Sequence, residues 1–459
     1  MQFRQTVIWK DIEKILQQPT NYYPIGVWYA NIHTVKRSIS TLKVINIDIE
    51  KDFVNSYTEV LMLTIMLDRG TYQTEVYPYL DNLEITLSRY PHRDSKSYSK
   101  TMQPDFKQKY KAIFLPNENS NPLGNVDEMN ATIGTELLKP VFAYFQLMNL
   151  NAEPMRLKYV SGSILGYPPE MALSSVIHDQ TSKIKLPTGK VIDKIDIATP
   201  DNGANIQNLV LPSDLNILEF PSFVHELRGV YNAGIGTFVS GYKDPTTKKI
   251  ENVFHVYPTH KTVKKNRPQL YLYNLPSFEL MYNDRTFSIK GNAIHAIGHI
   301  DQGYRETKQA SELSEGVGFR MASATNYMTK PIKETTQGPV AEPLKLNYKV
   351  VTKGRPDGFN LANRTEDISS SNPYKHYSRY VRQVGNHIFF RCMQLDSTYL
   401  KPSMPVTLYR LIGNTTVKQS CTLIGFKNII QMKDKGITTS AGYSEVTMLT
   451  LYITGLSGQ

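Results

Sequence analysis

The sequence predicts an α+β protein that is mainly β, with two small β-barrel domains joined by an irregular α/β middle region. Runs of β-branched and aromatic residues occur near both ends of the chain. Turn-forming residues separate these runs from one another. Only one long stretch between them has clear helical periodicity. The chain has 459 residues, of which 40% are hydrophobic. At about 150 residues per domain, this length predicts about three domains.

The first 24 residues are predicted to form an N-terminal arm with a short helix. Ile12, Ile15 and Leu16 have the spacing of one helix face, and Pro19 follows to end the segment. Charged residues stand where a secretory signal needs its apolar core. We therefore expect assembly in a cytoplasm.

Residues 25–160 are predicted to form the first β-barrel. Residues 44–49 alternate apolar with polar side chains, which is typical of a strand. Residues 59–68 and 83–87 are also strand-like in composition. Residues 91–130 are rich in charge, Ser, Asn and Pro, which predicts a long insertion loop between strands.

Residues 161–345 are predicted to form a mixed α/β middle domain. Its clearest element is a helix within residues 215–231, where Phe220, Phe223, Val224 and Leu227 share one face. Pro221 suits a helix start. Residues 330–343 have almost no large apolar side chain and predict a linker.

Residues 346–459 are predicted to form the C-terminal β-barrel. The runs PVTLYRLI, CTLIGFKNIIQM and VTMLTLYI are strand-like and are separated by turn-forming residues. The sequence contains no repeat with a fixed period.

Composition narrows the class of protein. The formal net charge is +11, but the basic residues form only short clusters and no base-reading motif is present, so nucleic acid is not an expected partner. The longest apolar run, at residues 60–67, is too short to span a membrane. Two cysteines, Cys392 and Cys421, cannot form a disulfide scaffold or a thiolate zinc site and are expected to be buried.

A search for catalytic motifs finds none with the required spacing. The glycines of GIGTFVSG precede a strand and so predict a tight connection rather than a dinucleotide site. His295 and His299 have helical metal-site spacing, but their surroundings predict an extended segment without the required glutamate. No catalytic, cofactor-binding or metal-ligating residue is therefore predicted. A metal held by one His from each subunit at a symmetry axis stays open.

Two stretches interleave basic and aromatic residues and are candidates for protein interfaces, where Tyr and Arg are favoured anchors. An ordinary half-exposed strand and a solvated loop are the alternatives for them. The first stretch contains Tyr374, His376, Tyr377, Arg379, Tyr380 and Arg382, and the second contains Lys261, Lys264, Lys265 and Arg267.

Three segments resemble one family. Residues 42–87, with their pattern of strand, gap, longer strand and short strand, resemble the first barrel of baseplate hub proteins from contractile-tailed bacteriophages. The segment LEFPSFVHELRGVYNAGIGTFVSGY resembles the family's helix that feeds a strand through an aromatic-Asn turn. Residues 400–406 (LKPSMPV) and the two runs after them are similar to its closing barrel.

The resemblance implies a non-enzymatic virion component. Hubs of this type are homotrimers in which each chain supplies two similar barrels, so that a hexameric tail tube and a trimeric spike can bind opposite faces. The implied partners are further copies of the chain, the tube and the spike. Two alternatives stay open: a baseplate wedge, collar or other tail-completion protein, and a hydrolase of cell wall or surface glycan.

Overall fold

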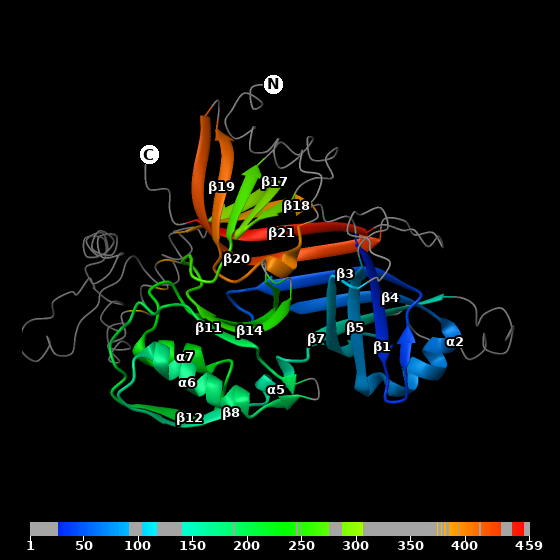
Figure 1. Ribbon diagram of the computed structural model, residues 1–459, viewed down its shortest axis with the longest axis horizontal. Coiled ribbons are helices and arrows are strands. Elements are labelled where there is room, and N and C mark those ends of the chain that lie inside the picture. Colours follow the sequence, from blue (N-terminus) through cyan, green and yellow to red (C-terminus); the bar gives the residue numbers. More distant parts are fainter. Residues whose placement is uncertain are drawn as a thin grey trace, which may run out of the picture.

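A computed structural model gives the fold of the chain (Figure 1). It describes residues 26–90, 103–116, 140–186, 189–244, 247, 249–274, 287–305, 374, 378, 381, 385–393, 395–412, 415–432 and 443–453. The predicted N-terminal helix and the predicted linker at residues 330–343 lie outside these residues.

The described fold is mainly β, as predicted. One sheet has 14 strands, and three small sheets accompany it in the described part of the chain. Its strand order is β19-β15-β17-β18-β21-β20-β3-β4-β7-β6-β5-β1-β2, with β16 paired to β17 and with β19 also paired to β20.

The N-terminal barrel contains the strands from β1 to β7. In several of its strands every second side chain is buried in the core, as the period of two requires. In β4, for example, Leu61, Leu63, Ile65 and Leu67 are all at most 1% exposed. The strands are β1 (Val27–His33), β2 (Ser38–Ser40), β3 (Lys43–Asp52), β4 (Val60–Asp68), β5 (Leu83–Tyr90), β6 (Phe106–Phe114) and β7 (Pro140–Asn149).

A bend between β2 and β3 closes this barrel. Thr41 N–H donates to Ala30 O of β1 at 3.1 Å, and the next residue, Leu42, donates to Met66 O of β4 at 3.0 Å. One bent strand therefore pairs with β1 at its start and with β4 further on. Three short helical turns, α2 (Arg69–Thr71), η2 (Tyr72–Val76) and η3 (Tyr77–Asn82), connect β4 to β5.

The C-terminal barrel is closed by hydrogen-bonded strands all the way round, because β19 pairs with both β15 and β20. A short strand, β16 (Phe287–Lys290), pairs with the start of β17. The six strands of the ring are β15 (Gln269–Asn274), β17 (Ala293–Arg305), β18 (Asn386–Met393), β19 (Pro405–Ile412), β20 (Thr415–Met432) and β21 (Tyr443–Ile453).

Both barrels have the same order of strands. If the bent β2–β3 strand counts as one, each ring has six strands, and numbering them along the chain gives the order 1-2-3-6-5-4 in both. One direction differs: β1 is antiparallel to both of its neighbours, whereas β15 is parallel to both of its own.

Two predicted segments differ from the observed strands. The prediction of an uninterrupted loop over residues 91–130 is wrong for β6, which lies between β5 and β7 in the sheet. The sequence also assigned β15 and β17 to the middle domain, but they pair with β18 and β19, so the C-terminal barrel begins before residue 346. Long-range strand pairing decides both cases, and the other boundaries stay a prediction.

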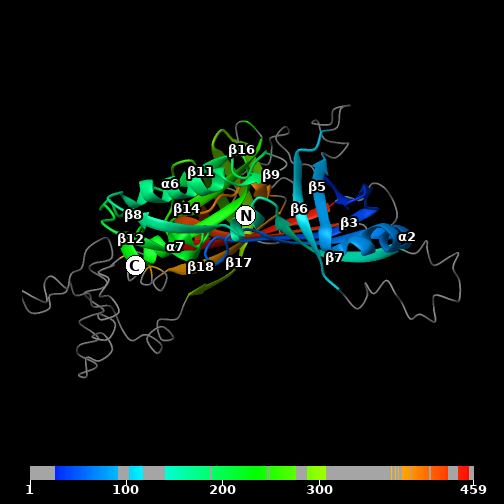
Figure 2. The ribbon, with the colours of Figure 1, turned by 90° about the horizontal axis from the view of Figure 1, so that it is seen from below.

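The middle region, residues 150–257, packs against the C-terminal barrel. Its buried side chains join most of those of the C-terminal barrel in one cluster, whereas a second cluster is formed mainly by the N-terminal barrel and includes Ile430 and Tyr443 of the C-terminal barrel. In Figure 2, helices α6 and α7 lie on the same side of the molecule as β17 and β18. The elements are α5 (Glu153–Arg156), β8 (Tyr159–Ile164), α6 (Pro169–Ser182), β9 (Lys185–Leu186), β10 (Gly189–Lys190), β11 (Lys194–Ile197), β12 (Leu209–Asn216), α7 (Phe220–Arg228), β13 (Gly236–Lys243) and β14 (Ile250–Tyr257).

The predicted helix is confirmed as α7, with Pro221 in its first turn. It ends at Gly229, whose φ of 71° suits glycine. The longer α6 was not predicted, because its mixed polar sequence has no clear apolar stripe. No helix among the described residues is long and apolar enough to cross a membrane.

Candidate assembly interface

The two barrels are joined edge to edge by β3 and β20, and we call this pairing the seam. The strands are antiparallel, with Asp52 opposite Gly425 and Asn46 opposite Gln431. A Cβ at Gly425 would lie 2.9 Å from the carbonyl oxygen of Lys51, so only glycine allows this close approach without a shift. The seam lets a backbone ladder continue from one barrel into the other (Figure 1).

Aromatic side chains fill the core beside the seam. The ring of Phe53 meets the ring of Phe426 at 6.0 Å and that of Phe238 at 5.0 Å, both in edge-to-face geometry. Phe53 directly follows β3, Phe426 lies on β20 and Phe238 lies on β13. Such pairs stabilise by about 0.5–1.5 kcal/mol beyond their burial. The seam is therefore fixed by packing as well as by backbone hydrogen bonds.

A buried lysine links the N-terminal barrel to the middle region. Lys51 Nζ donates to Ser240 Oγ at 2.7 Å and lies 3.7 Å from Glu59 Oε2. It also lies 4.7 Å from the centre of the Tyr242 ring. Burial lowers the pKa of Lys51, and the nearby Glu59 carboxylate partly opposes this shift.

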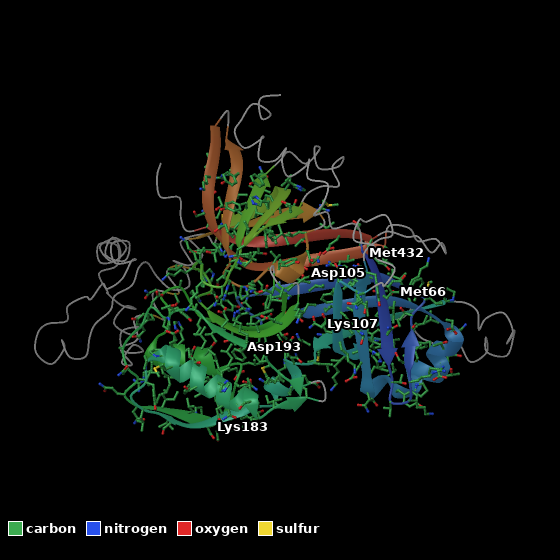
Figure 3. The ribbon with its side chains drawn as sticks, in the orientation of Figure 1. Met66, Asp105, Lys107, Lys183, Asp193 and Met432 are labelled. Atoms are coloured by element: carbon green, nitrogen blue, oxygen red, sulfur yellow. The ribbon has the colours of Figure 1, made fainter. Side chains whose placement is uncertain are left out.

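A larger group of buried charges joins all three parts of the chain, and we call it the junction cluster. The Arg89 guanidinium on β5 donates to Asp105 and to Asp396, each at 2.9 Å. Lys243 Nζ, at the end of β13, lies 3.9 Å from Asp396 Oδ2. Asp396 comes from the loop after β18. Figure 3 labels Asp105 at the level where the barrels meet.

The fifth member of the junction cluster is Glu445 on β21. Its carboxylate accepts a hydrogen bond from Asn428 Nδ2 at 2.7 Å. Burial raises its pKa to about 7, with Arg89 opposing the rise and Asp396 adding to it. Burial also acts against ionisation of Asp396, but Arg89 and Lys243 outweigh it and lower the pKa of that carboxyl. Glu445 is therefore the group whose charge changes near neutral pH.

A third polar group ties the middle region to the C-terminal barrel. Asp196 on β11 accepts hydrogen bonds from His255 Nδ1 at 2.8 Å and from the Arg267 guanidinium. Arg267 Nε also donates to Pro402 O at 2.8 Å. His255 is 1% exposed, and burial lowers its pKa to about 3. This Asp–His pair is enclosed by the protein and holds two parts of the chain together.

The basic candidates from the sequence do not lie together on one surface. Arg267 is 2% exposed, so the prediction that it anchors a partner is corrected: its charge is used inside the chain. Lys261 is exposed and forms an ion pair with Asp201 at 2.6 Å. Lys264 and Lys265 are exposed in the same loop and stay predicted contact residues.

The aromatic candidates are described only in part. Tyr374 is half-buried, and its carbonyl accepts a hydrogen bond from Ser378 Oγ at 2.7 Å. Ser378 Oγ in turn accepts from Gly234 N–H at 2.8 Å, which ties this stretch to the middle region. His376, Tyr377, Arg379, Tyr380 and Arg382 lie outside the described residues and stay predictions.

An aromatic stack on the C-terminal barrel was missed by sequence reasoning. The rings of Tyr273 and Tyr409 lie 5.2 Å apart at an interplanar angle of 7°, and the rings of Tyr271 and His295 lie 4.9 Å apart at 15°. The alternation of Tyr271 and Tyr273 in YLY was the available signal. His295 lies on strand β17, as its surroundings predict. Among the described residues, no group of three or more His, Cys, Asp or Glu side chains could hold a metal ion.

The two cysteines are buried, as expected, and both are thiols. Burial raises the pKa of the Cys421 thiol to about 12, and it raises that of Cys392 further. Neither side chain is therefore a ready nucleophile at neutral pH.

No protein-family profile and no curated protein matches this chain by sequence. A tail protein from Neisseria meningitidis is similar in structure, with 8% identity, a TM-score of 0.44, and coverage of 93% of this chain and 96% of that chain. A prophage tail protein from Shewanella oneidensis has 9% identity, a TM-score of 0.43, and coverage of 93% and 99%. A component of the E. coli type VI secretion system has 5% identity, a TM-score of 0.41, and coverage of 90% and 74%.

Proposed function

We propose that the protein is a non-enzymatic structural subunit of a phage tail, a hub that forms a homotrimer and adapts the symmetry of the tail tube to that of the central spike. The observation that carries this proposal is the shared strand order of the two barrels, together with their edge-to-edge seam. One chain thereby supplies two similar units side by side.

The differences between the barrels support the adapter role. Three chains would place six similar barrels in a ring, which suits a hexameric partner on one face. The middle region shares its core mainly with the C-terminal barrel, and Phe53, next to β3, joins that core from the N-terminal side. It would therefore repeat three times around the same ring and offer a three-fold face to a trimeric spike.

The charge of the chain bears on its partners in the virion. A net charge of +11 favours neighbours with acidic faces, and it speeds association at low salt. We expect the tube and the spike to supply those faces.

The first test is the mass of the purified protein by light scattering at low and moderate salt. We expect three times 52.3 kDa. A monomer at all salt concentrations would count against the hub and favour a wedge or collar position. Tube and spike proteins from the same phage should then bind opposite faces of the trimer, which electron microscopy of the mixtures can resolve.

A separate assay tests the absence of enzymatic activity. Incubation of the protein with purified peptidoglycan should leave the turbidity unchanged. A turbidity loss that a single carboxylate substitution abolishes would instead favour the hydrolase alternative.

A further inference from the structure

We propose that the seam is repeated between chains: the far half of β17 in one copy pairs, edge to edge, with the end of β6 in the next copy. The surface is formed by residues 299–305 and residues 113–116, and its partner is a second copy of this chain. This inference rests on the proposed trimer and names the contact that closes it.

The position of each strand in its barrel leads to this pairing. Within one chain, the seam joins strand 5 of the C-terminal barrel, β20, to strand 2 of the N-terminal barrel, β3. Such a contact is head-to-tail, so it uses different edges of two similar units. Strand 5 of the N-terminal barrel is β6, and strand 2 of the C-terminal barrel is β17. A repeat of the same contact must therefore join β6 to β17.

β17 has the edge that this repeat needs. It pairs with β15 only as far as Gly298, and it pairs with β18 from Gly298 to Arg305. Its second half therefore has no strand partner on the β15 side among the described residues. Asp301 and Gly303 are exposed there. In β20, likewise, the pairing with β19 ends at Thr422, and the residues from Gly425 onward form the seam.

β6 has the matching edge. Its pairing with β5 ends at Ala112, whereas its contact with β7 continues through Phe114 and a hydrogen bond from Leu115 N–H to Tyr144 O at 2.9 Å. The side of residues 113–116 that faces away from β7 therefore lacks a strand partner in the described part of the chain. Ile113 is 40% exposed at this point.

The arrangement of the strands allows closure. The strand order places β17 and β7 at the two ends of the row β17-β18-β21-β20-β3-β4-β7, which runs through the seam. A row that curves in one direction brings the two ends of successive copies together in a ring. Exposed strand edges promote pairing with other chains, and a closed ring leaves neither edge exposed.

Thiol cross-linking tests the contact directly. Single variants Ile113→Cys and Asp301→Cys are made in the full chain and joined with a short bis-maleimide, because the buried Cys392 and Cys421 do not compete. We expect covalent dimers when the two single variants are mixed, and none from either variant alone. The double variant should give a ladder that stops at three chains. The matched control mixes the Asp301→Cys variant with a Val35→Cys variant. Val35 lies in an exposed turn of the N-terminal barrel, away from the proposed contact.

Each outcome separates this inference from the proposed function. If the two strand edges pair, the two thiols are held close together at a millimolar effective concentration. The mixed variants should then give about 100-fold more cross-linked dimer than the control mixture. A trimer by light scattering whose mixed pair matches the control would overturn the strand contact and leave the trimer intact. Covalent dimers from one single variant alone would show a two-fold contact and overturn the inference as well. A monomer would refute both proposals.

Discussion

The N-terminal and C-terminal barrels have one strand order but close in different ways. The C-terminal barrel closes through eight paired positions between β19 and β20. The N-terminal barrel closes through a bend, where Thr41 and Leu42 donate to opposite neighbours. The first strand also runs in opposite directions in the two rings. A barrel of this order therefore tolerates reversal of one strand and replacement of a ladder by a bend.

The two barrels also differ in how they contact the rest of the chain. The C-terminal barrel shares most of its core with the middle region, whereas the core of the N-terminal barrel includes Ile430 and Tyr443 from the C-terminal barrel and little of the middle region. The N-terminal barrel is tied to the rest of the chain by the seam and by buried charges. Changes at these ties should therefore uncouple the two barrels before they disrupt either one.

The largest effect is expected from Arg89→Met, which removes the shared partner of Asp105 and Asp396. Loss of one member of a buried ion pair leaves uncompensated buried charge and costs about 3–5 kcal/mol. Urea unfolding should show this loss in the free energy of unfolding. Arg37→Ala, at an exposed ion pair with Glu75, is the control and should cost less than about 1 kcal/mol. Equal losses in the two variants would contradict the role of the junction cluster.

A smaller effect, dependent on pH, is expected from Glu445→Gln. Because the pKa of Glu445 is raised to about 7 from 4.5, the folded state takes up a proton between these values. Stability of the natural chain should therefore fall by about 3 kcal/mol as pH rises from 4.5 to 7, and this term should stay constant above it.

The glutamine variant stays neutral and should lose this slope, measured as the free energy of unfolding at several pH values. Glu84→Gln, at a half-exposed glutamate of β5, should keep it. Parallel profiles for the natural chain and Glu445→Gln would show that folding does not shift the pKa of Glu445.

Gly425→Ala tests the seam with a smaller expected loss. The added Cβ would meet the Lys51 carbonyl oxygen at 2.9 Å, and the two strands must shift apart. Strain of this kind costs about 1–3 kcal/mol. Gly203→Ala, where a Cβ meets nothing within 4 Å, is the control. If thermal unfolding gave the same midpoint for both variants, the close approach at the seam would be disproved.

The smallest effect is expected from two aromatic pairs, one on each barrel. Tyr409→Leu removes a stacked contact with Tyr273, and Tyr29→Leu removes an edge-to-face contact with Tyr90 at 5.4 Å. Each should cost about 0.5–1.5 kcal/mol in chemical unfolding. Tyr29 is 52% exposed, so its loss should be the lesser of the two. The reverse order would mean that burial does not set the strength of these contacts.

Much of the fold follows from local sequence pattern. Alternation predicted β3, a strand-like run predicted β4, helical spacing predicted α7, and the surroundings of His295 predicted a strand. The charged residues of β6 concealed its strand, although Phe106, Tyr110 and Ala112 point inward at even spacing. The membership of β15 in the C-terminal barrel depends on pairing with a strand more than 100 residues away, which no local pattern records.

The interface was less predictable, because its members come from distant parts of the chain. Arg267 was predicted as a surface anchor from its basic neighbours, but Asp196 and Pro402 enclose it. Arg89 and Asp396 are 307 positions apart and form an ion pair only after the barrels meet. A basic cluster in the sequence therefore does not reveal which of its charges is used internally.

The seam also sets how the molecule carries mechanical load. A force that slides β3 along β20 acts in shear, so all the hydrogen bonds between Asn46 and Asp52 resist it together. A force that peels the barrels apart from one end breaks those bonds one at a time. The seam is therefore stiff toward a force along the strands and weak toward a force across them.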